Sequence, residues 1–161
     1  MIIQFLVDHG AWDVHILKAI EMVGKDKCRK VNMAMDVGAN LSFFTNVVLP
    51  IGCQVTSFEI QPNMAQRVMF SACSNGKKDR LTLHVGDVGE HSGMLKMVNA
   101  GARNLGGIGI TEDDTGISVH SHCIDSLMDP QTPIMVMKVD IEGYEDKAPN
   151  GMAKIFENKL V

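Results

Sequence analysis

Apolar residues near the start of the chain recur at intervals of three and four, at Trp12, Ile16, Leu17, Ile20 and Val23. This spacing is typical of an amphipathic helix that buries one face. The pattern predicts a helix over residues 11–23 that ends at Gly24, followed by a charged, solvated loop over residues 25–30.

Farther along the chain, short apolar runs alternate with helix-like segments. Runs that predict strands lie at residues 33–36, 55–58, 81–85 and 134–139. Residues 43–49, the segment that begins at Pro62, and residues 152–161 have helical spacing. Strands that alternate with helices predict a mostly parallel sheet with helices on both faces. We therefore expect one α/β domain over residues 1–161, a three-layer α/β/α sandwich with its ligand-binding core over residues 33–145.

The most informative stretch runs from Met33 to Phe44 and has the pattern of a strand, a tight turn at Gly38 and a helix. The N-terminus of such a helix presents backbone N–H groups, and a glycine lets a ligand approach the backbone without a Cβ in the way. The second strand ends in Glu59, at the place where a nucleotide-binding βαβ unit has an acid for a ribose diol. These features predict a nucleotide-type cofactor.

NAD is the weaker prediction for this cofactor. A dinucleotide-binding turn has the pattern G-x-G-x-x-G, whereas this turn has only Gly38, with Asn40 and Ser42 at the later positions. A reductase with a Tyr-x-x-x-Lys pair is also disfavoured, because Tyr144 is followed three residues later by Lys147.

Acidic residues stand at the predicted carboxyl ends of four strands, at Asp36, Glu59, Asp87 and Asp140. Ligands of open α/β sheets bind at these ends. Four acids at one rim suit a cofactor with hydroxyls, an exocyclic amine and a positive sulfonium, and they suit a diphosphate badly. Asp87 follows Gly86, so ordinary turn chemistry is an equal alternative for this residue.

Four motifs together resemble the FkbM-type family of class I S-adenosylmethionine-dependent methyltransferases. They are D-V-G-A-N at 36–40, F-E-I-Q-P at 58–62, I-D at 124–125 and K-V-D-I-E-G-Y-E at 138–145. The chain differs at Ser42, where the family usually has glycine, and at Ile60, where it usually has proline. It also ends at Val161, whereas family chains normally continue. The resemblance therefore implies a Rossmann-like methyltransferase sandwich that lacks its last strands, with an added strand pair near residues 108–111 and 117–124.

The resemblance also implies S-adenosylmethionine as the cofactor and methyl transfer to a hydroxyl of a sugar, lipid or polyketide-type small molecule. Cofactor contacts would come from Asp36, Gly38, Ala39, Asn40, Ser42, Phe43, Glu59, Ile60, Asp87 and Asp140. A hydroxyl acceptor needs a general base, which would be Asp140 or Glu142, with His122 a third candidate. The acids around Gly143 exceed what a turn requires, although Glu142 and Glu145 could also only stabilise a helix N-terminus.

Composition narrows the possible partners. The net charge of −4 provides no basic stripe, so we do not expect nucleic acid binding. The four cysteines lack C-x-x-C spacing, and we expect reduced, buried thiols. His120 and His122 would share one strand face, but without a third ligand a polar face is the better interpretation than a metal site. Without a membrane-spanning run or a signal-peptide pattern, we expect a cytoplasmic protein.

A non-catalytic role is the main alternative. A shortened methyltransferase fold would bind the cofactor weakly or act as an interaction module. Without strands after the acidic motif, the sheet edge at the fourth strand would be open. We therefore expect either marginal stability or association of two copies through this edge.

Overall fold

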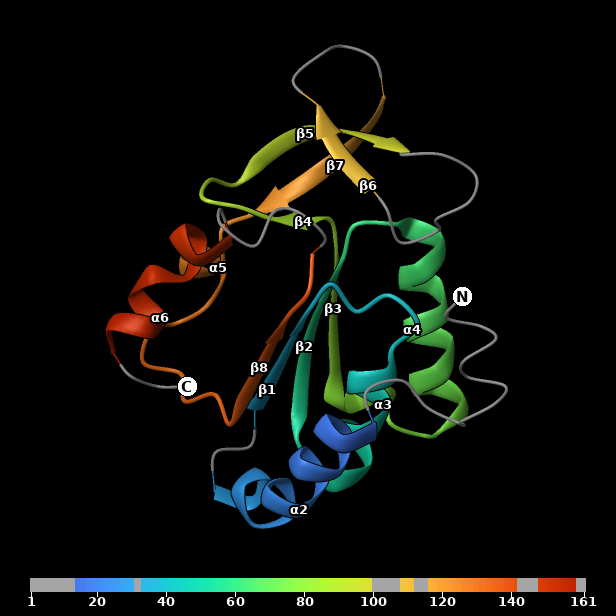
Figure 1. Cartoon of the computed structure of the whole chain (residues 1–161), viewed down its shortest axis with the longest axis vertical. Helices are drawn as coiled ribbons and strands as arrows, with labels where there is room; N and C mark the ends of the chain where they lie inside the picture. Colours follow the sequence, from blue (N-terminus) through green and yellow to red (C-terminus); the bar gives the residue numbers. More distant parts are fainter. Residues whose placement is uncertain (1–13, 31–32, 100–107, 112–115, 142–147, 159–161) are drawn as a thin grey trace.

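Four parallel strands form the centre of the structure, a computed structural model that describes residues 14–30, 33–99, 108–111, 116–141 and 148–158 (Figure 1). The strand order is β3-β2-β1-β8, and every neighbouring pair is parallel. The strands are β1 (Met33–Val37), β2 (Gln54–Glu59), β3 (Leu81–Val85) and β8 (Val136–Val139). All four predicted strands are therefore confirmed.

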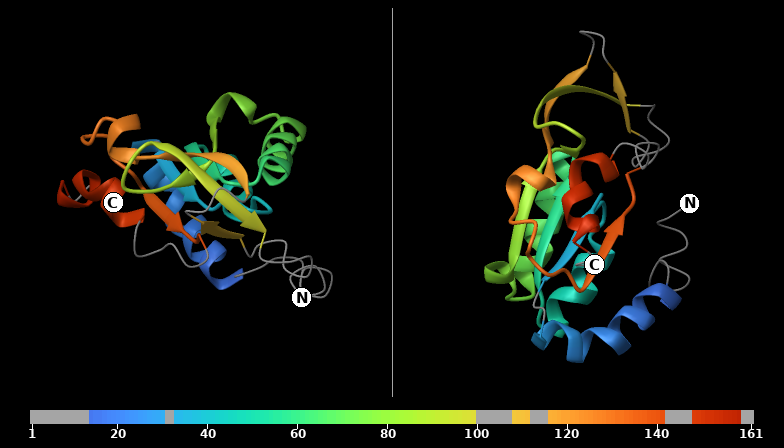
Figure 2. Two further views of the ribbon diagram at one scale, coloured as in Figure 1. Left: turned by 90° about the horizontal axis from the view of Figure 1, so that it is seen from above. Right: turned by 90° about the vertical axis from the view of Figure 1, so that its left-hand side faces the viewer.

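Helices cover both faces of this sheet. One face carries α2 (Val14–Lys30), α3 (Phe43–Ile51) and α4 (Pro62–Ser74), and the other carries α5 (Ile124–Leu127), η2 (Ala148–Met152) and α6 (Ala153–Glu157) (Figures 1 and 2). Side chains of a strand alternate between the faces, so Ala34 packs with Val48 of α3 while Met35 packs with Ile155 of α6. The predicted three-layer α/β/α fold is confirmed. A short η1 (Lys78–Arg80) leads into β3.

The first helix differs from its prediction. It continues through Gly24 to Lys30, so the predicted end at Gly24 and the predicted loop over residues 25–30 are wrong. A Cβ added at Gly24 would lie 3.3 Å from the Ile51 side chain and 3.7 Å from the Met135 sulfur. This glycine therefore allows close packing of α2 on α3 and the sheet. Residues 11–13 lie outside the described residues.

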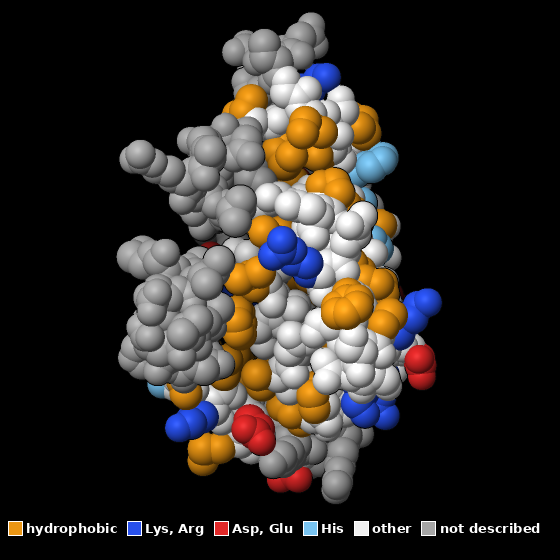
Figure 3. All heavy atoms as spheres, turned by 90° about the vertical axis from the view of Figure 1, so that its right-hand side faces the viewer, with side chains coloured by type: hydrophobic (Ala, Val, Ile, Leu, Met, Phe, Trp, Pro, Cys, Tyr) orange, Lys and Arg blue, Asp and Glu red, His pale blue; other side chains and the backbone are white. Residues whose placement is uncertain are grey.

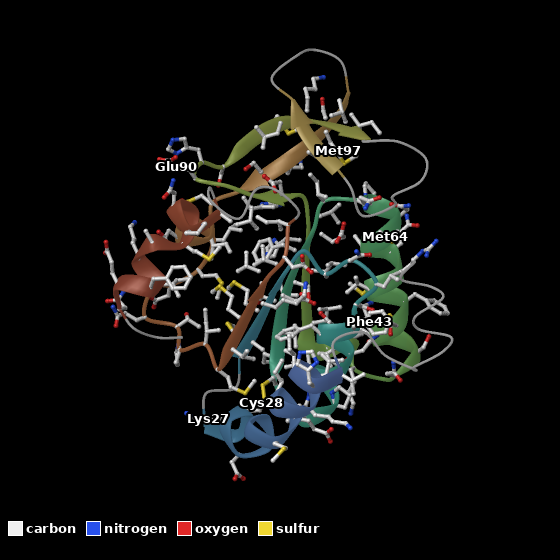
Figure 4. The ribbon with its side chains drawn as sticks, in the orientation of Figure 1. Lys27, Cys28, Phe43, Met64, Glu90 and Met97 are labelled. Atoms are coloured by element: carbon white, nitrogen blue, oxygen red, sulfur yellow. A yellow bond between two sulfur atoms is a disulfide. The ribbon has the colours of Figure 1, made fainter. Side chains whose placement is uncertain are left out.

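Cys28 of α2 and Cys53, just before β2, form a disulfide, with their Cα atoms 4.9 Å apart (Figure 4). The prediction of reduced thiols is therefore wrong for this pair, which the fold brings together from opposite ends of the first βα unit. Cys73 and Cys123 are free. The predicted cytoplasmic location stays a prediction.

A second sheet lies beyond the carboxyl ends of β2 and β3 (Figure 1). Its order is β4-β7-β5-β6, and the strands are β4 (Asp87–Val88), β7 (Ile117–His122), β5 (Gly93–Asn99) and β6 (Ile108–Thr111). β4 pairs with β7 in parallel, and the other two pairs are antiparallel. The two added strands are present as β6 and β7, but they do not pair with each other, because β5, which was not predicted, lies between them. Ile124 begins α5 rather than ending a strand.

Within the described residues, β8 pairs only with β1, so it forms an edge of the main sheet. Association of copies through this edge stays a prediction. The helix predicted over residues 152–161 corresponds to α6, which spans Ala153–Glu157 and directly follows η2. Residues 159–161 lie outside the described residues. None of the described helices has the length and apolar character needed to cross a bilayer.

Candidate functional site

The turn between β1 and α3 is held against the end of β2. The N–H groups of Gly38 and Ala39 both donate to the carbonyl oxygen of Phe58, each at 3.0 Å. Gly38, Asn40 and Ser42 have φ angles of +83°, +47° and +62°. Because φ of this sign favours glycine, the geometry explains why a glycine suits the position of Ser42. The Ser42 hydroxyl is buried and accepts a hydrogen bond from Asn46 at 2.9 Å.

Gly38 lies against the chain after β8. A Cβ added to it would collide with the carbonyl oxygen of Asp140 and lie 3.2 Å from the Ile141 side chain. The Asp140 N–H also donates to the Val37 carbonyl at 2.9 Å. The position of a Cβ at Gly38 is therefore filled by the chain after β8, and contact of a ligand with this glycine stays a prediction. The glycine joins the ends of β1 and β8.

Glu59 holds together the turn after β1 and the turn after β2. Its side chain is buried, and its two carboxylate oxygens accept hydrogen bonds from the N–H groups of Asn40 at 2.7 Å and Gln61 at 2.9 Å. Burial raises the pKa of Glu59, and these two backbone bonds oppose that rise. Each carboxylate oxygen retains a further acceptor position for a ligand hydroxyl.

Asp36 faces the protein interior. It is fully buried, and its Oδ2 accepts a hydrogen bond from the Thr45 hydroxyl at 2.6 Å. Thr45 in turn lies 2.9 Å from the Ser57 hydroxyl. Burial raises the pKa of Asp36, and the positive charge of Lys138 is the main opposing effect. The carboxylate thus fixes α3 on the sheet, and a direct contact between Asp36 and a cofactor stays a prediction.

Lys138 contacts three groups around the turn after β1. Its Nζ donates to the Gly38 carbonyl at 3.0 Å and lies 3.2 Å from Asp140 Oδ2 and 3.7 Å from Asp36 Oδ1. The sequence predicted only that Lys138 interrupts an apolar strand. Lys138 is the register partner of Asp36 across β1 and β8. To predict this ion pair from the sequence, one would have to know that these two strands are neighbours.

Replacing Lys138 with methionine is expected to lower the free energy of unfolding by about 2–4 kcal/mol, because the substitution leaves the Asp36 carboxylate buried without its counter-charge. Burial raises the pKa of Asp36, so the loss should grow as pH rises, because deprotonation of Asp36 creates the unpaired charge. Urea unfolding over a range of pH measures it. Lys27→Met, at an exposed position of α2, is the control and should change stability by less than about 0.5 kcal/mol. Equal losses of unfolding free energy in the two variants would exclude Lys138 as the counter-charge of Asp36.

Asp87 has an unpaired acceptor. The residue begins β4 directly after Gly86, is buried, and has no hydrogen-bond partner for Oδ2 among the described atoms. Burial raises the pKa of Asp87 to about 6, opposed by the N–H of Val88. Turn chemistry therefore accounts for one interaction of this carboxylate and leaves one oxygen for a donor such as an exocyclic amine.

Asp87 also predicts a pH dependence. Its pKa rises from 3.8 to about 6 on folding, so the folded state binds more protons between these values. The contribution of Asp87 to stability is therefore complete below about pH 4 and is lost as pH rises through 6, by up to about 3 kcal/mol. Asp87→Asn should flatten this part of the profile in urea titrations from pH 4 to 7. Glu157→Gln, an exposed control, should retain the parent profile, and a retained profile in Asp87→Asn would contradict the assignment.

The remaining predicted residues lie around the same turns. Ala39 and Phe43 line a pocket of about 700 Å³ together with Asn40 and Asp140. Ile60 is half-buried directly after β2, and the side chain of Asp140 is 63% exposed. Glu142 lies outside the described residues. The structure thus brings the ends of β1, β2 and β8 into contact, with Asp87 placed after β3.

His84 and His122 pack near Phe58. His84 stacks on Phe58 with ring centroids 4.8 Å apart, and His122 lies 5.4 Å from His84. Burial, with a smaller effect of His122, lowers the pKa of His84. Over the described ranges, no group of three or more histidine, cysteine or acidic side chains is placed to hold a metal ion.

Comparison with known proteins identifies the family. Residues 36–158 match the family model described as Methyltransferase FkbM domain, which is more than half of the chain. The chain belongs to the FkbM methyltransferase family. The match begins at Asp36 and includes Glu59, Asp87, Lys138 and Asp140, so the acidic strand ends of the FkbM chain all lie within it.

Other comparisons add little about the FkbM chain. A search of curated proteins finds no match. Among solved structures, a "putative rRNA-methylase" from Clostridium thermocellum is 12% identical with a TM-score of 0.48. The alignment covers 91% of this chain and 64% of that one, so the FkbM chain spans under two thirds of that protein. A similarity at this level gives no information about the reaction or its acceptor.

Proposed function

We propose that this FkbM chain binds S-adenosylmethionine and transfers its methyl group to a hydroxyl of a small molecule. One arrangement carries the proposal: Glu59, with free acceptor positions, and Asp87, with an unpaired buried oxygen, follow neighbouring strands at the same end of the sheet. Ribose hydroxyls and an exocyclic amine are the donors of an adenosyl group that would pair with them.

The other residues would complete this site. Glu59 would bind the ribose and Asp87 the adenine amine, while Ile60, Ala39 and Phe43 would contact apolar parts of the cofactor. Asn40 would be held in place by Glu59, and Gly38, Ser42 and Asp36 would act by shaping the turn. Two phosphates would meet the carboxylates of Glu59 and Asp87, and the repulsion between these like charges disfavours NAD.

Asp140 is the proposed general base. Its exposed carboxylate stands at the end of β8, where Lys138 holds it at 3.2 Å. S-adenosylmethionine supplies a methyl group already activated on a positive sulfonium, so the chain need only position the acceptor and take its proton. The proton of the acceptor hydroxyl would pass to the Asp140 carboxylate. The sequence motif assigns the same role to Glu142 as an alternative.

Calorimetric titration with S-adenosylmethionine, its demethylated product and NAD in parallel tests the cofactor assignment. The first two are expected to bind, and Glu59→Ala should weaken them by about 1.5–3 kcal/mol through loss of charge-assisted bonds. Because Glu59 also accepts bonds from Asn40 and Gln61, melting curves must accompany the titrations. Glu157→Ala, at the exposed end of α6, is the control. Unchanged affinity in Glu59→Ala, or tighter binding of NAD, would refute the assignment.

A further inference from the structure

A pocket of about 700 Å³ lies beside the proposed cofactor site, between α2, the start of α3 and β8. Its walls are mainly apolar: α2 contributes Ile16, Leu17 and Ile20, and α3 contributes Phe43 and Phe44. This volume is in the range of pockets that enclose small molecules.

Polar groups of the pocket gather at one end. Along β8 its lining runs from Val136 to Asp140, a length of about 13 Å at the usual rise of a strand. Ile20 and Val136 pack against the same apolar cluster at the beginning of this wall. Lys138, Asp140 and Asn40 stand at the other end, where Lys138 contacts both Asp140 and the first turn. The pocket therefore has an apolar interior and a charged mouth.

The pocket shares its charged mouth and the turn that leads into α3 with the proposed cofactor site. The nucleoside residues Glu59, Ile60 and Asp87 do not line the pocket, whereas Ala39, Asn40, Phe43 and Asp140 do. The amino and carboxylate groups of a methionine tail would lose hydration against Ile16, Leu17 and Ile20 without gaining partners. The cofactor consequently accounts for the charged mouth and the start of α3, but not for the apolar wall that α2 contributes.

We propose that this pocket holds the apolar body of the methyl acceptor and presents its hydroxyl to Asp140, so that the acceptor is a lipid-like alcohol rather than a sugar. The inference rests on the proposed methyl transfer and names its substrate class. A sugar would place several hydroxyls against aliphatic and aromatic walls, each without a hydrogen-bond partner. An alkyl chain would instead bury apolar surface there and need polar partners only at its hydroxyl end.

Straight-chain primary alcohols from 1-butanol to 1-octanol are suitable probes, with methyl glucoside as the polar comparison. Binding to the intact chain is measured by ligand-observed NMR, with and without the demethylated cofactor. Affinity is expected to rise up to about fourfold for each methylene until the apolar interior is filled. Methyl glucoside should bind more weakly than 1-octanol.

Two substitutions on α2 separate the pocket from the rest of the helix. Ile16 lines the pocket and is 49% exposed, so Ile16→Glu should fold and weaken 1-octanol at least about tenfold. Met22, on the same helix outside the pocket lining, is 82% exposed, and Met22→Glu should leave 1-octanol binding unchanged. Both variants should bind the demethylated cofactor like the parent.

The possible outcomes distinguish this proposal from the proposed function. If the parent binds neither S-adenosylmethionine nor its product, the methyltransferase proposal fails, while alcohol binding still reports on the pocket. If cofactor binds but methyl glucoside outcompetes 1-octanol, the acceptor class is wrong. If Ile16→Glu weakens the cofactor instead of the alcohol, the pocket belongs to the cofactor. If Ile16→Glu converts a dimer into a monomer and leaves the affinity for alcohols unchanged, the pocket is an interface between two copies, and the proposal is overturned.

Discussion

Asp140→Asn is expected to reduce turnover about 10²–10⁴-fold while leaving the affinity for S-adenosylmethionine nearly unchanged. The Asp140 side chain is 63% exposed at the mouth of the pocket, and its Oδ2 lies 3.2 Å from Lys138 Nζ. An amide at this position keeps the size of the carboxylate but cannot accept the acceptor's proton. The assay is release of the demethylated cofactor with 1-octanol and with hydroxylated sugars.

Asp129→Asn, at an exposed position in the turn before β8, is the matched control and should retain the parent rate. Glu142→Gln is assayed in parallel, because the sequence motif assigns the base to either residue. A purely structural role of these acids predicts a stability loss of about 0.5–2 kcal/mol and no specific effect on rate. If both variants turn over at the parent rate, neither residue is the base.

Gly38→Ala is expected to lower the free energy of unfolding by at least about 3 kcal/mol, a large share of the 5–15 kcal/mol typical of a domain. Two effects add. The φ of +83° is unfavourable for any residue with a Cβ, and the new Cβ would overlap the backbone carbonyl of Asp140. A backbone oxygen cannot turn aside as a side chain can, so the ends of β1 and β8 must separate.

Gly76→Ala separates these two effects. Gly76 also has a positive φ, of +61°, but no atom lies within 4 Å of a Cβ built on it. At Gly76 only the unfavourable backbone conformation contributes, so the free energy of unfolding is expected to fall by about 1–2 kcal/mol. Urea unfolding of both variants measures the difference. Equal losses would mean that the contact between Gly38 and Asp140 contributes nothing to stability.

The fold was predictable where a local pattern sufficed. The apolar runs that became β1, β2, β3 and β8 each carry their own signal, and their alternation with helices indicates the layers. The pattern failed at Gly24, because a glycine that ends a helix and one that lets two helices pack closely look the same in sequence. β5 was missed because Lys96 interrupts its short apolar run.

The positions of the acids were predictable, but their contacts were not. The pattern placed Glu59 and Asp87 at strand ends, yet the sequence could not reveal that Glu59 holds two turns or that Asp87 retains an unpaired oxygen. Lys138 and the Cys28–Cys53 bond depend on which strands become neighbours. Such contacts join distant segments, so they follow from the sheet order and from no local spacing.

That sheet order also sets a sequence of events during synthesis of the chain. β1 and β2 can pair soon after both have left the ribosome, and β3 can then pair with β2. The other neighbour of β1 is β8, so Ala34 can pair with Val136 only once β8 has been synthesised. Contacts of such long range form slowly, and an unpaired strand edge can meanwhile join a wrong partner. The nascent protein would therefore leave one edge of β1 exposed until β8 emerges. Its Asp36 would meet Lys138 only after β8 has docked.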